Sequence, residues 1–171
     1  MAVNYFAYGS NMASHRLLAR IPGATKISTA TLPGHRLRFR KSDRGRSAKC
    51  DIEMTGNLLD RVHGVVYQFS NQDKQILDRY EGLGVGYNDK PVDLDTKTGQ
   101  VISAFTYYAL EVDEGMIPYH WYKDHVLHGA TEHRLPADYI SMIEAVPSKR
   151  DPDTTRSERE LAIYGLEKSS G

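Results

Sequence analysis

The sequence predicts one α+β domain, built as a mixed and largely antiparallel sheet or small barrel with helices on its outside. The chain has 171 residues, which is a usual length for one domain. Hydrophobic residues make up 40% of it, enough for a single core. Strand-like and helical segments are interspersed without strict alternation, so a doubly wound parallel sheet is not required.

The first predicted unit is a strand, a tight loop and a helix. Residues 3–8 are β-prone and aromatic, which is typical of a buried strand, and Gly9 ends it. We expect Ser10 or Asn11 to cap the following helix, which stops before Pro22. The apolar positions of that helix are Met12, Leu17, Leu18 and Ile21.

A basic segment follows at 35–49, with seven Lys or Arg residues and one acid, Asp43. Residues 35–40 alternate as in a strand, so Leu37 and Phe39 face one way and three arginines the other. The first interpretation is an exposed strand face with a loop, and the alternative is a basic surface for a substrate or partner. Only one aromatic residue lies among the cations, so a nucleic-acid-binding face is poorly supported.

The middle of the chain predicts a further strand and helix. Residues 62–69 form a continuous strand-like run, and 70–82 have the pattern of a helix that stops at Gly82. Ser70 or Asn71 is the expected cap. The expected apolar face consists of Ile76, Leu77 and Tyr80.

The C-terminal half predicts two more strands and two helices. The strands lie near 90–95 and 101–110, and the helices at 119–128 and 136–146. The buried stripe of the second helix consists of Ile140, Ile143 and Val146.

Beyond Pro147 the sequence becomes polar and charged. We therefore expect a domain of residues 1–147, followed by a peripheral tail at 148–171. A capping box from Thr155 to Glu158 is expected to open a short helix in that tail.

The loop at 8–11 is the first candidate for chemistry. A glycine-containing turn between a strand and a helix leaves backbone N–H groups available to an anion, and the Ser10 hydroxyl lies beside them. An ordinary turn with a helix cap is the simpler interpretation. Ser10 is poorly supported as a nucleophile, because its surroundings are not G-x-S-x-G and no His or Asp is tied to it by spacing.

Glu81 is the second candidate, since it occupies the last position of a predicted helix, just before Gly82. The negative end of the helix dipole disfavours a carboxylate there, and burial would favour the neutral acid further. A carboxyl group in such a position suits a general acid or base. The simpler interpretation is a solvated glutamate at a helix end.

Metal and thiol chemistry is poorly supported. His125 and His128 have an i, i+3 spacing, but no Cys pair or HExxH motif accompanies them, so we predict no metal site. Cys50 is the one cysteine, which excludes an intrachain disulfide and fits a reducing, cytoplasmic compartment.

The charge balance and hydropathy limit the partners. Lys plus Arg and Asp plus Glu each number 22, so no overall field attracts nucleic acid or a membrane surface. No apolar run approaches the ~20 residues of a membrane span, and the N-terminus lacks the regions of a signal peptide.

Three stretches, taken in this order, resemble the γ-glutamylcyclotransferase family. They are YFAYGSNM at 5–12, LDRYEG at 77–82 and HGATEHRLPADYISMIEAV at 128–146. The resemblance implies a small mixed β-barrel with flanking helices. It also implies cleavage of a γ-glutamyl amide by cyclisation to 5-oxoproline, with release of an amine or amino acid and without a metal or organic cofactor.

The resemblance also assigns residues. It implies that Glu81 is the catalytic acid and base. The implied substrate-binding residues are Tyr5, Phe6, Ala7, Tyr8, Gly9, Ser10, Asn11, Tyr87, Tyr107 and Tyr122.

The expected partner is therefore a small-molecule γ-glutamyl substrate, and a homodimer is left open. One alternative keeps the reaction but uses a γ-glutamylamine or another γ-glutamyl metabolite. A second alternative is a non-catalytic member of the fold that binds a small anion or a partner protein. The presence of Glu81 counts against it, since loss of that carboxylate would be its simplest signature.

Overall fold

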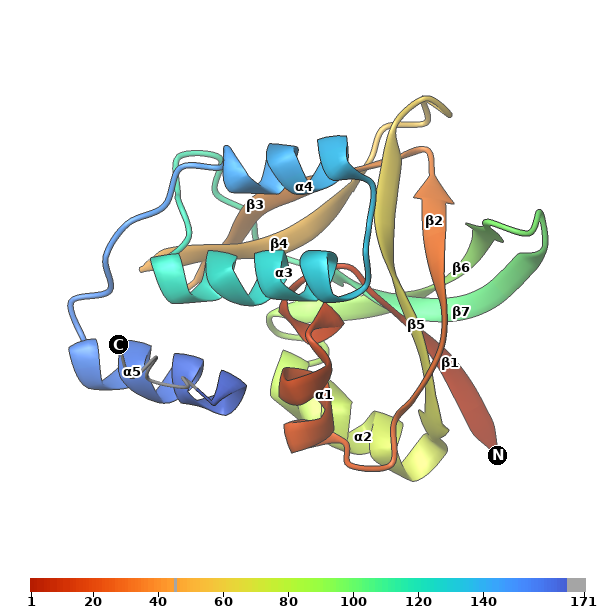
Figure 1. The fold of residues 1–171 in the computed structure, drawn as a ribbon, viewed down its shortest axis with the longest axis horizontal. Helices are drawn as coiled ribbons and strands as arrows, with labels where there is room; N and C mark the ends of the chain where they lie inside the picture. The colour runs from red at the N-terminus through yellow and green to blue at the C-terminus, as the bar shows by residue number, and fades with distance from the viewer. Residues whose placement is uncertain (45, 166–171) are drawn as a thin grey trace, which may run out of the picture.

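A closed five-stranded barrel forms the centre of the computed structural model, which describes residues 1–44 and 46–165 (Figure 1). Neighbouring strands are antiparallel except β1 and β7, which meet in parallel at Tyr5 and Phe105 and so close the barrel. The predicted α+β class and small mixed barrel are confirmed. In spatial order the strands are β1 (Ala2–Ala7), β5 (Arg61–Ser70), β2 (Thr25–Pro33), β6 (Tyr87–Thr96) and β7 (Val101–Ala109).

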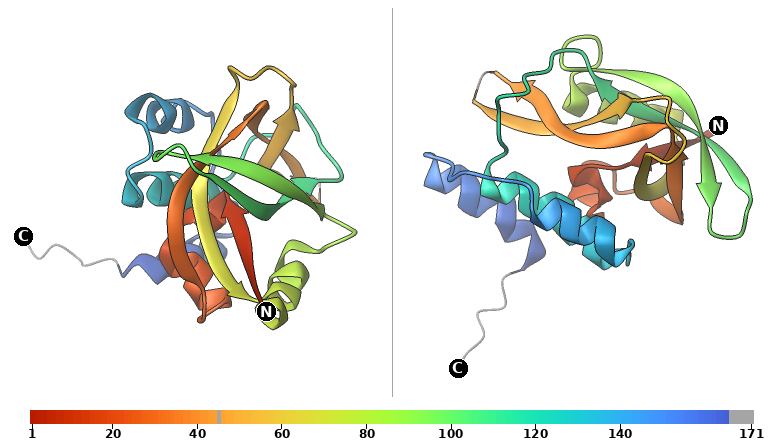
Figure 2. Two further views of the ribbon diagram at one scale, coloured as in Figure 1. Left: turned by 90° about the vertical axis from the view of Figure 1, so that its right-hand side faces the viewer. Right: turned by 90° about the horizontal axis from the view of Figure 1, so that it is seen from above.

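A separate hairpin of β3 (His35–Asp43) and β4 (Ser47–Met54) extends beyond the barrel (Figure 2). Its arginines alternate with the buried Leu37, as predicted. Arg36 is exposed, Arg38 and Arg40 are half-buried, and all three pair with acids, so the exposed-face interpretation fits only the start of the basic segment. The pairs are Arg36 with Asp60, Arg38 with Glu114, and Arg40 with Asp51, at 3.0, 2.9 and 2.9 Å.

The helices lie around the barrel. Figure 1 shows α3 and α4 together on one side, with α1 and α2 below them in that view. The helices are α1 (Ser14–Arg20), α2 (Asn71–Glu81), α3 (His120–Glu132), α4 (Ala137–Glu144) and α5 (Thr154–Leu161), with 3₁₀ turns η1 (Ser10–Met12) and η2 (Ala162–Tyr164).

The structure corrects one predicted helix cap. Neither Ser10 nor Asn11 caps α1, because both belong to η1 and their side chains are bound elsewhere. Ala13 is the N-cap of α1 and offers no side-chain hydrogen bond. Of the two caps expected for α2, Ser70 is the one observed, and it forms a capping box with Asp73.

The cap of α5 also differs from the prediction. Asp153, rather than Thr155, is the N-cap, and its carboxylate accepts a hydrogen bond from the Arg156 N–H at 2.9 Å. Aspartate is as good a capping residue as threonine, and the sequence offered both within three positions.

The apolar face of α2 is narrower than predicted. Leu77 is fully buried, but Ile76 is 40% exposed and Tyr80 57% exposed. The ring of Tyr80 instead lies under the guanidinium of Arg20, 4.9 Å from its centroid. On α1, Leu18 is likewise exposed.

The segment beyond Pro147 contacts the rest of the chain. The buried carboxylate of Asp151 accepts a hydrogen bond from Trp121 Nε1 at 2.8 Å, and it pairs with Arg156. In α5, Glu160 pairs with Arg16 of α1 at 2.6 Å. Residues 166–171 of the predicted tail lie outside the described residues, and the boundary at 147 stays a prediction.

Candidate active site

A narrow cavity of about 30 Å³ lies where β1, β7 and the end of α2 meet β4 and α3. Five of its lining residues are tyrosines, three more come from the turn after β1, and one is the predicted acid Glu81. Nine of the ten lining residues are ones that the sequence predicts. The ten are Tyr5, Tyr8, Gly9, Ser10, Asn11, Cys50, Glu81, Tyr87, Tyr107 and Tyr122.

The turn at Gly9 is packed against two other elements. A Cβ atom at Gly9 would lie 3.0 Å from the Cβ of Cys50 and 3.4 Å from the hydroxyl of Tyr122. A carbon in that position is too close to the first atom, so a residue without a side chain lets the turn approach β4 and α3. The close packing fixes the turn at the wall of the cavity.

Three successive amides in this turn lack a hydrogen-bond partner within the part of the chain that the structure describes. For the N–H groups of Gly9, Ser10 and Asn11, no acceptor lies among the described residues. Ser10 and Asn11 are nevertheless 9% and 4% exposed. Buried N–H groups are nearly always paired, so these amides are suited to receive a carboxylate or carbonyl oxygen from a ligand.

Glu81 ends α2, as predicted, and Gly82 follows it in the left-handed conformation at φ 65°. Its Oε1 accepts hydrogen bonds from Asn11 Nδ2 at 2.8 Å and from Arg20 Nη1 at 3.4 Å. Both donors hold the carboxylate at the wall of the cavity, where a general acid or base would have to lie.

The five tyrosines form the walls of the cavity as neutral phenols. Burial is the main cause that raises the pKa of each above its ordinary value. The Tyr8 hydroxyl donates to the Tyr107 carbonyl at 2.7 Å, and the Tyr107 hydroxyl donates to Asp78 at 2.6 Å. These bonds hold the rings in place, and Glu81 is the only carboxylate among the lining residues.

Cys50 is a lining residue that the sequence did not indicate. Its N–H donates to the Tyr122 hydroxyl at 2.9 Å, and its carbonyl accepts from the Tyr87 hydroxyl at 2.8 Å. The backbone of β4 thus positions the side chains of Tyr87 and Tyr122. Burial raises the pKa of the Cys50 thiol, so the reactive thiolate is disfavoured.

Two predicted pocket residues do not line the cavity. Phe6 and Ala7 are fully buried in the hydrophobic core. Phe6 points to the other side of β1 from Tyr5, as successive strand residues do, and its ring packs against Gly64. Ala7 has no side chain beyond Cβ with which to reach the cavity.

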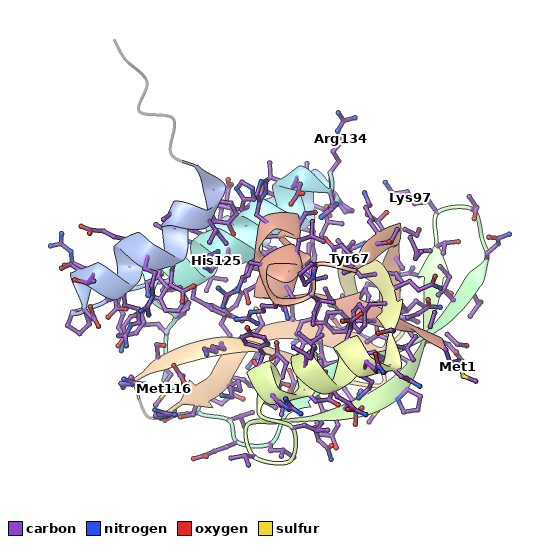
Figure 3. All side chains as sticks on the ribbon, turned by 90° about the horizontal axis from the view of Figure 1, so that it is seen from below. Met1, Tyr67, Lys97, Met116, His125 and Arg134 are labelled. Carbon is purple, nitrogen blue, oxygen red and sulfur yellow. The ribbon has the colours of Figure 1, made fainter. Side chains whose placement is uncertain are left out.

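The predicted histidine pair has a different environment from a metal site. Figure 3 marks His125 on α3, beside α5. Its ring is fully buried and contacts Arg16, Glu160 and Tyr164 at 3.1, 3.1 and 2.5 Å. His128 stacks on Tyr164. Within the described ranges, no three His, Cys, Asp or Glu side chains are grouped to hold a metal ion.

Comparison with known proteins identifies the class. Residues 61–143 match the model of the AIG2-like family. A solved structure named gamma-glutamyl cyclotransferase superposes with a TM-score of 0.85 at 26% identity, over 96% of this chain and 99% of that one.

No helix in the described part of the chain has both the length and the apolar character needed to cross a membrane.

Two curated relatives give the family itself. The gamma-glutamylcyclotransferase of Bos taurus is 31% identical over 147 residues, which are 83% of this chain and 77% of the relative. That of Homo sapiens is 30% identical over the same shares. The chain therefore belongs to the γ-glutamylcyclotransferase family of enzymes.

Proposed function

We propose that this protein converts γ-glutamyl amides into 5-oxoproline and a free amine or amino acid. The observation that carries the proposal is one juxtaposition. Glu81 lines the same narrow cavity as Gly9, Ser10 and Asn11, whose amides have no acceptor among the residues that the structure describes. The carboxylate serves a proton-transfer step, and the amides serve to bind a carboxylate or carbonyl oxygen.

The reaction supplies its own nucleophile. The α-ammonium of the γ-glutamyl group loses a proton to Glu81, and its nitrogen attacks the γ-carbonyl carbon to form the five-membered lactam. The amide C–N bond to the leaving group breaks as Glu81 returns the proton to the leaving nitrogen. A second ammonium proton is released as the lactam forms, and the amine product takes it up.

The other residues orient the substrate. Folding one molecule into a ring-closing geometry is worth up to roughly 7–11 kcal/mol, so positioning is the main task of the site. The turn amides would hold the α-carboxylate or the developing oxyanion. Walls of neutral tyrosines would hold the apolar chain in a bent form. Neither the thiol of Cys50 nor the hydroxyl of Ser10 is needed as a nucleophile.

The test is release of 5-oxoproline from a panel of γ-glutamyl amino acids, γ-glutamylamines and glutathione. We expect release from at least one class, in the presence of a strong chelator and with Cys50→Ala as well as wild type. Complete loss with chelator and recovery with zinc would contradict the metal-free mechanism. No release from any substrate would favour a non-catalytic, anion-binding member of the family.

The proposal also covers partners and compartment. We propose a small-molecule substrate, no nucleic-acid partner and a cytoplasmic location. The single, buried Cys50 supports a reducing compartment. A homodimer stays open, and sedimentation velocity would decide it.

A further inference from the structure

A second, larger cavity of about 460 Å³ adjoins the narrow one. The two share Ser10, Glu81, Tyr87 and Tyr122 as lining residues, so a substrate held by the inner cavity would extend into the outer one. The β3–β4 hairpin, α1 and the last turn of α2 supply much of its wall, and Figure 3 shows α1 and α2 on the side facing the viewer.

The outer cavity is strongly basic. Seven cationic side chains line it against three acidic ones, Asp43, Glu81 and Glu111. Three of the cations have carboxylate partners: Arg20 pairs with Glu81, Lys49 lies 3.8 Å from Asp43, and Arg16 pairs with Glu160 of α5. An excess of positive charge is therefore left facing the space.

Among these cations, Lys41 gives the clearest indication of an anion site. It is 9% exposed, yet among the described residues no carboxylate lies within ion-pair distance of it. Its Nζ lies 5.2 Å from the centre of the Tyr87 ring, next to the inner cavity. The side chain is largely buried and lines the outer cavity, so its ammonium is well placed for an anion that enters from outside.

The strand register adds an independent observation. Lys41 of β3 lies directly across from Lys49 of β4. Like charges in opposed positions destabilise a hairpin. Burial lowers the pKa of Lys49, and the charge of Lys41 lowers it further against the attraction of Asp43. An anion between the two strands would remove this repulsion.

We propose that the outer cavity binds the leaving group of the substrate and selects amines that carry two negative charges. Two sources provide that chemistry: an acidic amino acid with two carboxylates, or an amine with a phosphate. The inference rests on the proposed cyclotransferase function, since it assigns the leaving-group side of the same reaction. Arg79 at the end of α2, also without a carboxylate partner in the described chain, would add to the attraction.

The experiment compares four substrates that differ in leaving-group charge. They are γ-glutamylglutamate, γ-glutamylphosphoethanolamine, γ-glutamylalanine and γ-glutamylisopropylamine, which carry two, two, one and no negative charges on the leaving group. We expect kcat/KM to rise by about tenfold with each charge, mainly through KM, and the differences to shrink in about 0.5 M salt. The first two substrates distinguish the carboxylate source from the phosphate source.

Variants locate the effect. Lys41→Gln and Arg79→Gln should each reduce the preference for γ-glutamylglutamate over γ-glutamylisopropylamine by about fivefold to tenfold. Arg36→Gln is the matched control, because Arg36 is a cation of the same hairpin that pairs with Asp60 outside the cavity. It should leave the preference unchanged.

Failure of the inference and failure of the proposed function are distinguishable. Equal kcat/KM across the four substrates would overturn the inference and leave the function standing. If no substrate yields 5-oxoproline, calorimetric binding of the same compounds to Glu81→Gln tests the cavity alone. Tighter binding of the dianions, weakened by Lys41→Gln, would support the inference, and equal binding would overturn it.

Discussion

Glu81 shows how a single residue gains its role from contacts that lie far away in the chain. Its place at a helix end comes from its neighbours in sequence, but its two hydrogen-bond donors come from η1 and α1. Asn11 also joins Tyr5 to this carboxylate, through Nδ2 at 3.2 Å from the Tyr5 hydroxyl. Glu81, one wall of the cavity and the turn after β1 are thus parts of one hydrogen-bond network.

Replacement of Glu81 by glutamine should lower turnover by roughly 10²–10⁴-fold, because the side chain keeps its shape but cannot accept a proton. KM should change much less, since the turn amides are untouched. Glu81→Asp should also be poor, because the shorter side chain would not reach the amine. Steady-state release of 5-oxoproline measures both, with Glu144→Gln on the exposed side of α4 as control. Near-normal turnover of Glu81→Gln would show that another group is the base.

Substitution of Gly9 tests the close packing of the turn. Gly9→Ala places a methyl group against the Cβ of Cys50 and should destabilise the fold by about 1–3 kcal/mol, the usual range for overpacking. Denaturant unfolding measures the change. The double variant Gly9→Ala/Cys50→Gly removes the opposing carbon. If it recovers none of the lost stability relative to Cys50→Gly alone, steric contact with Cys50 is not the reason for glycine.

At this scale the sequence predicted the motif residues well. Tyr5, Tyr8 and Glu81 lie in short, specific stretches and meet in the cavity. The positions of Cys50 and Arg20 at the site were not predicted. They depend on contacts between residues far apart in the chain, which no local sequence pattern indicates. Phe6 and Ala7 were assigned with their motif, although strand alternation sends Phe6 into the core.

Helix α5 shows the corresponding behaviour of a whole element. It lies far from the motifs in sequence, yet its Glu160 pairs with Arg16, whose Nε donates to the Ser10 hydroxyl at 3.1 Å. Burial alone would raise the pKa of Glu160, but the hydrogen bond with His125 and the charge of Arg16 hold it at about 2. The docked helix therefore supports a residue of the cavity through an ionised carboxylate.

Glu160→Gln removes that charge and should lower stability by about 1–2 kcal/mol, since the pair is only partly buried. KM should rise more than kcat falls, because the Ser10 hydroxyl loses its fixed position while Glu81 is unaffected. Glu158→Gln, on an exposed position of the same helix, is the matched control. In the wild type the contribution of Glu160 is present above about pH 4.5 and lost as the pH falls toward about 2. An unchanged KM in Glu160→Gln would exclude the positioning role.

Element boundaries followed the sequence where local signals were strong. The capping box and Gly82 fixed both ends of α2. Strands β2 and β4 were not predicted, because their sequences, TKISTATLP and SAKCDIEM, mix polar residues into segments that become strands by pairing with neighbours. The α5 cap was misplaced because two good capping residues stand close together.

At the scale of the whole molecule, four partly or fully buried histidines favour the neutral form in the folded state. Burial is the main cause that lowers the pKa values of His35, His63, His125 and His133 below 6.5. The unfolded chain therefore binds more protons than the folded one below that pH. Stability should be fully present above about pH 6.5 and should fall as the solution becomes more acidic through the folded pKa values.

Thermal unfolding at about pH 7.5 and about pH 5.5 measures this dependence, with a lower Tm expected at the acidic value. His63→Gln should make Tm depend less on pH, because it removes one of these four titrating rings. We choose His63 because its ring is only partly buried, so its replacement should disturb the fold little. A Tm that is equal or higher at the acidic pH would contradict the prediction.

The barrel closes through one paired position between β1 and β7. Of the five strand pairings in the barrel, this closing joint has the fewest paired residues. Tyr5 and Tyr107, on these two strands, both line the narrow cavity. A molecule held there touches both sides of the joint, so its binding free energy adds to the free energy needed to open the barrel. Bound product should therefore slow amide hydrogen exchange in β1 and β7 more than in α4. At saturation, the ligand would reversibly stabilise the closed barrel.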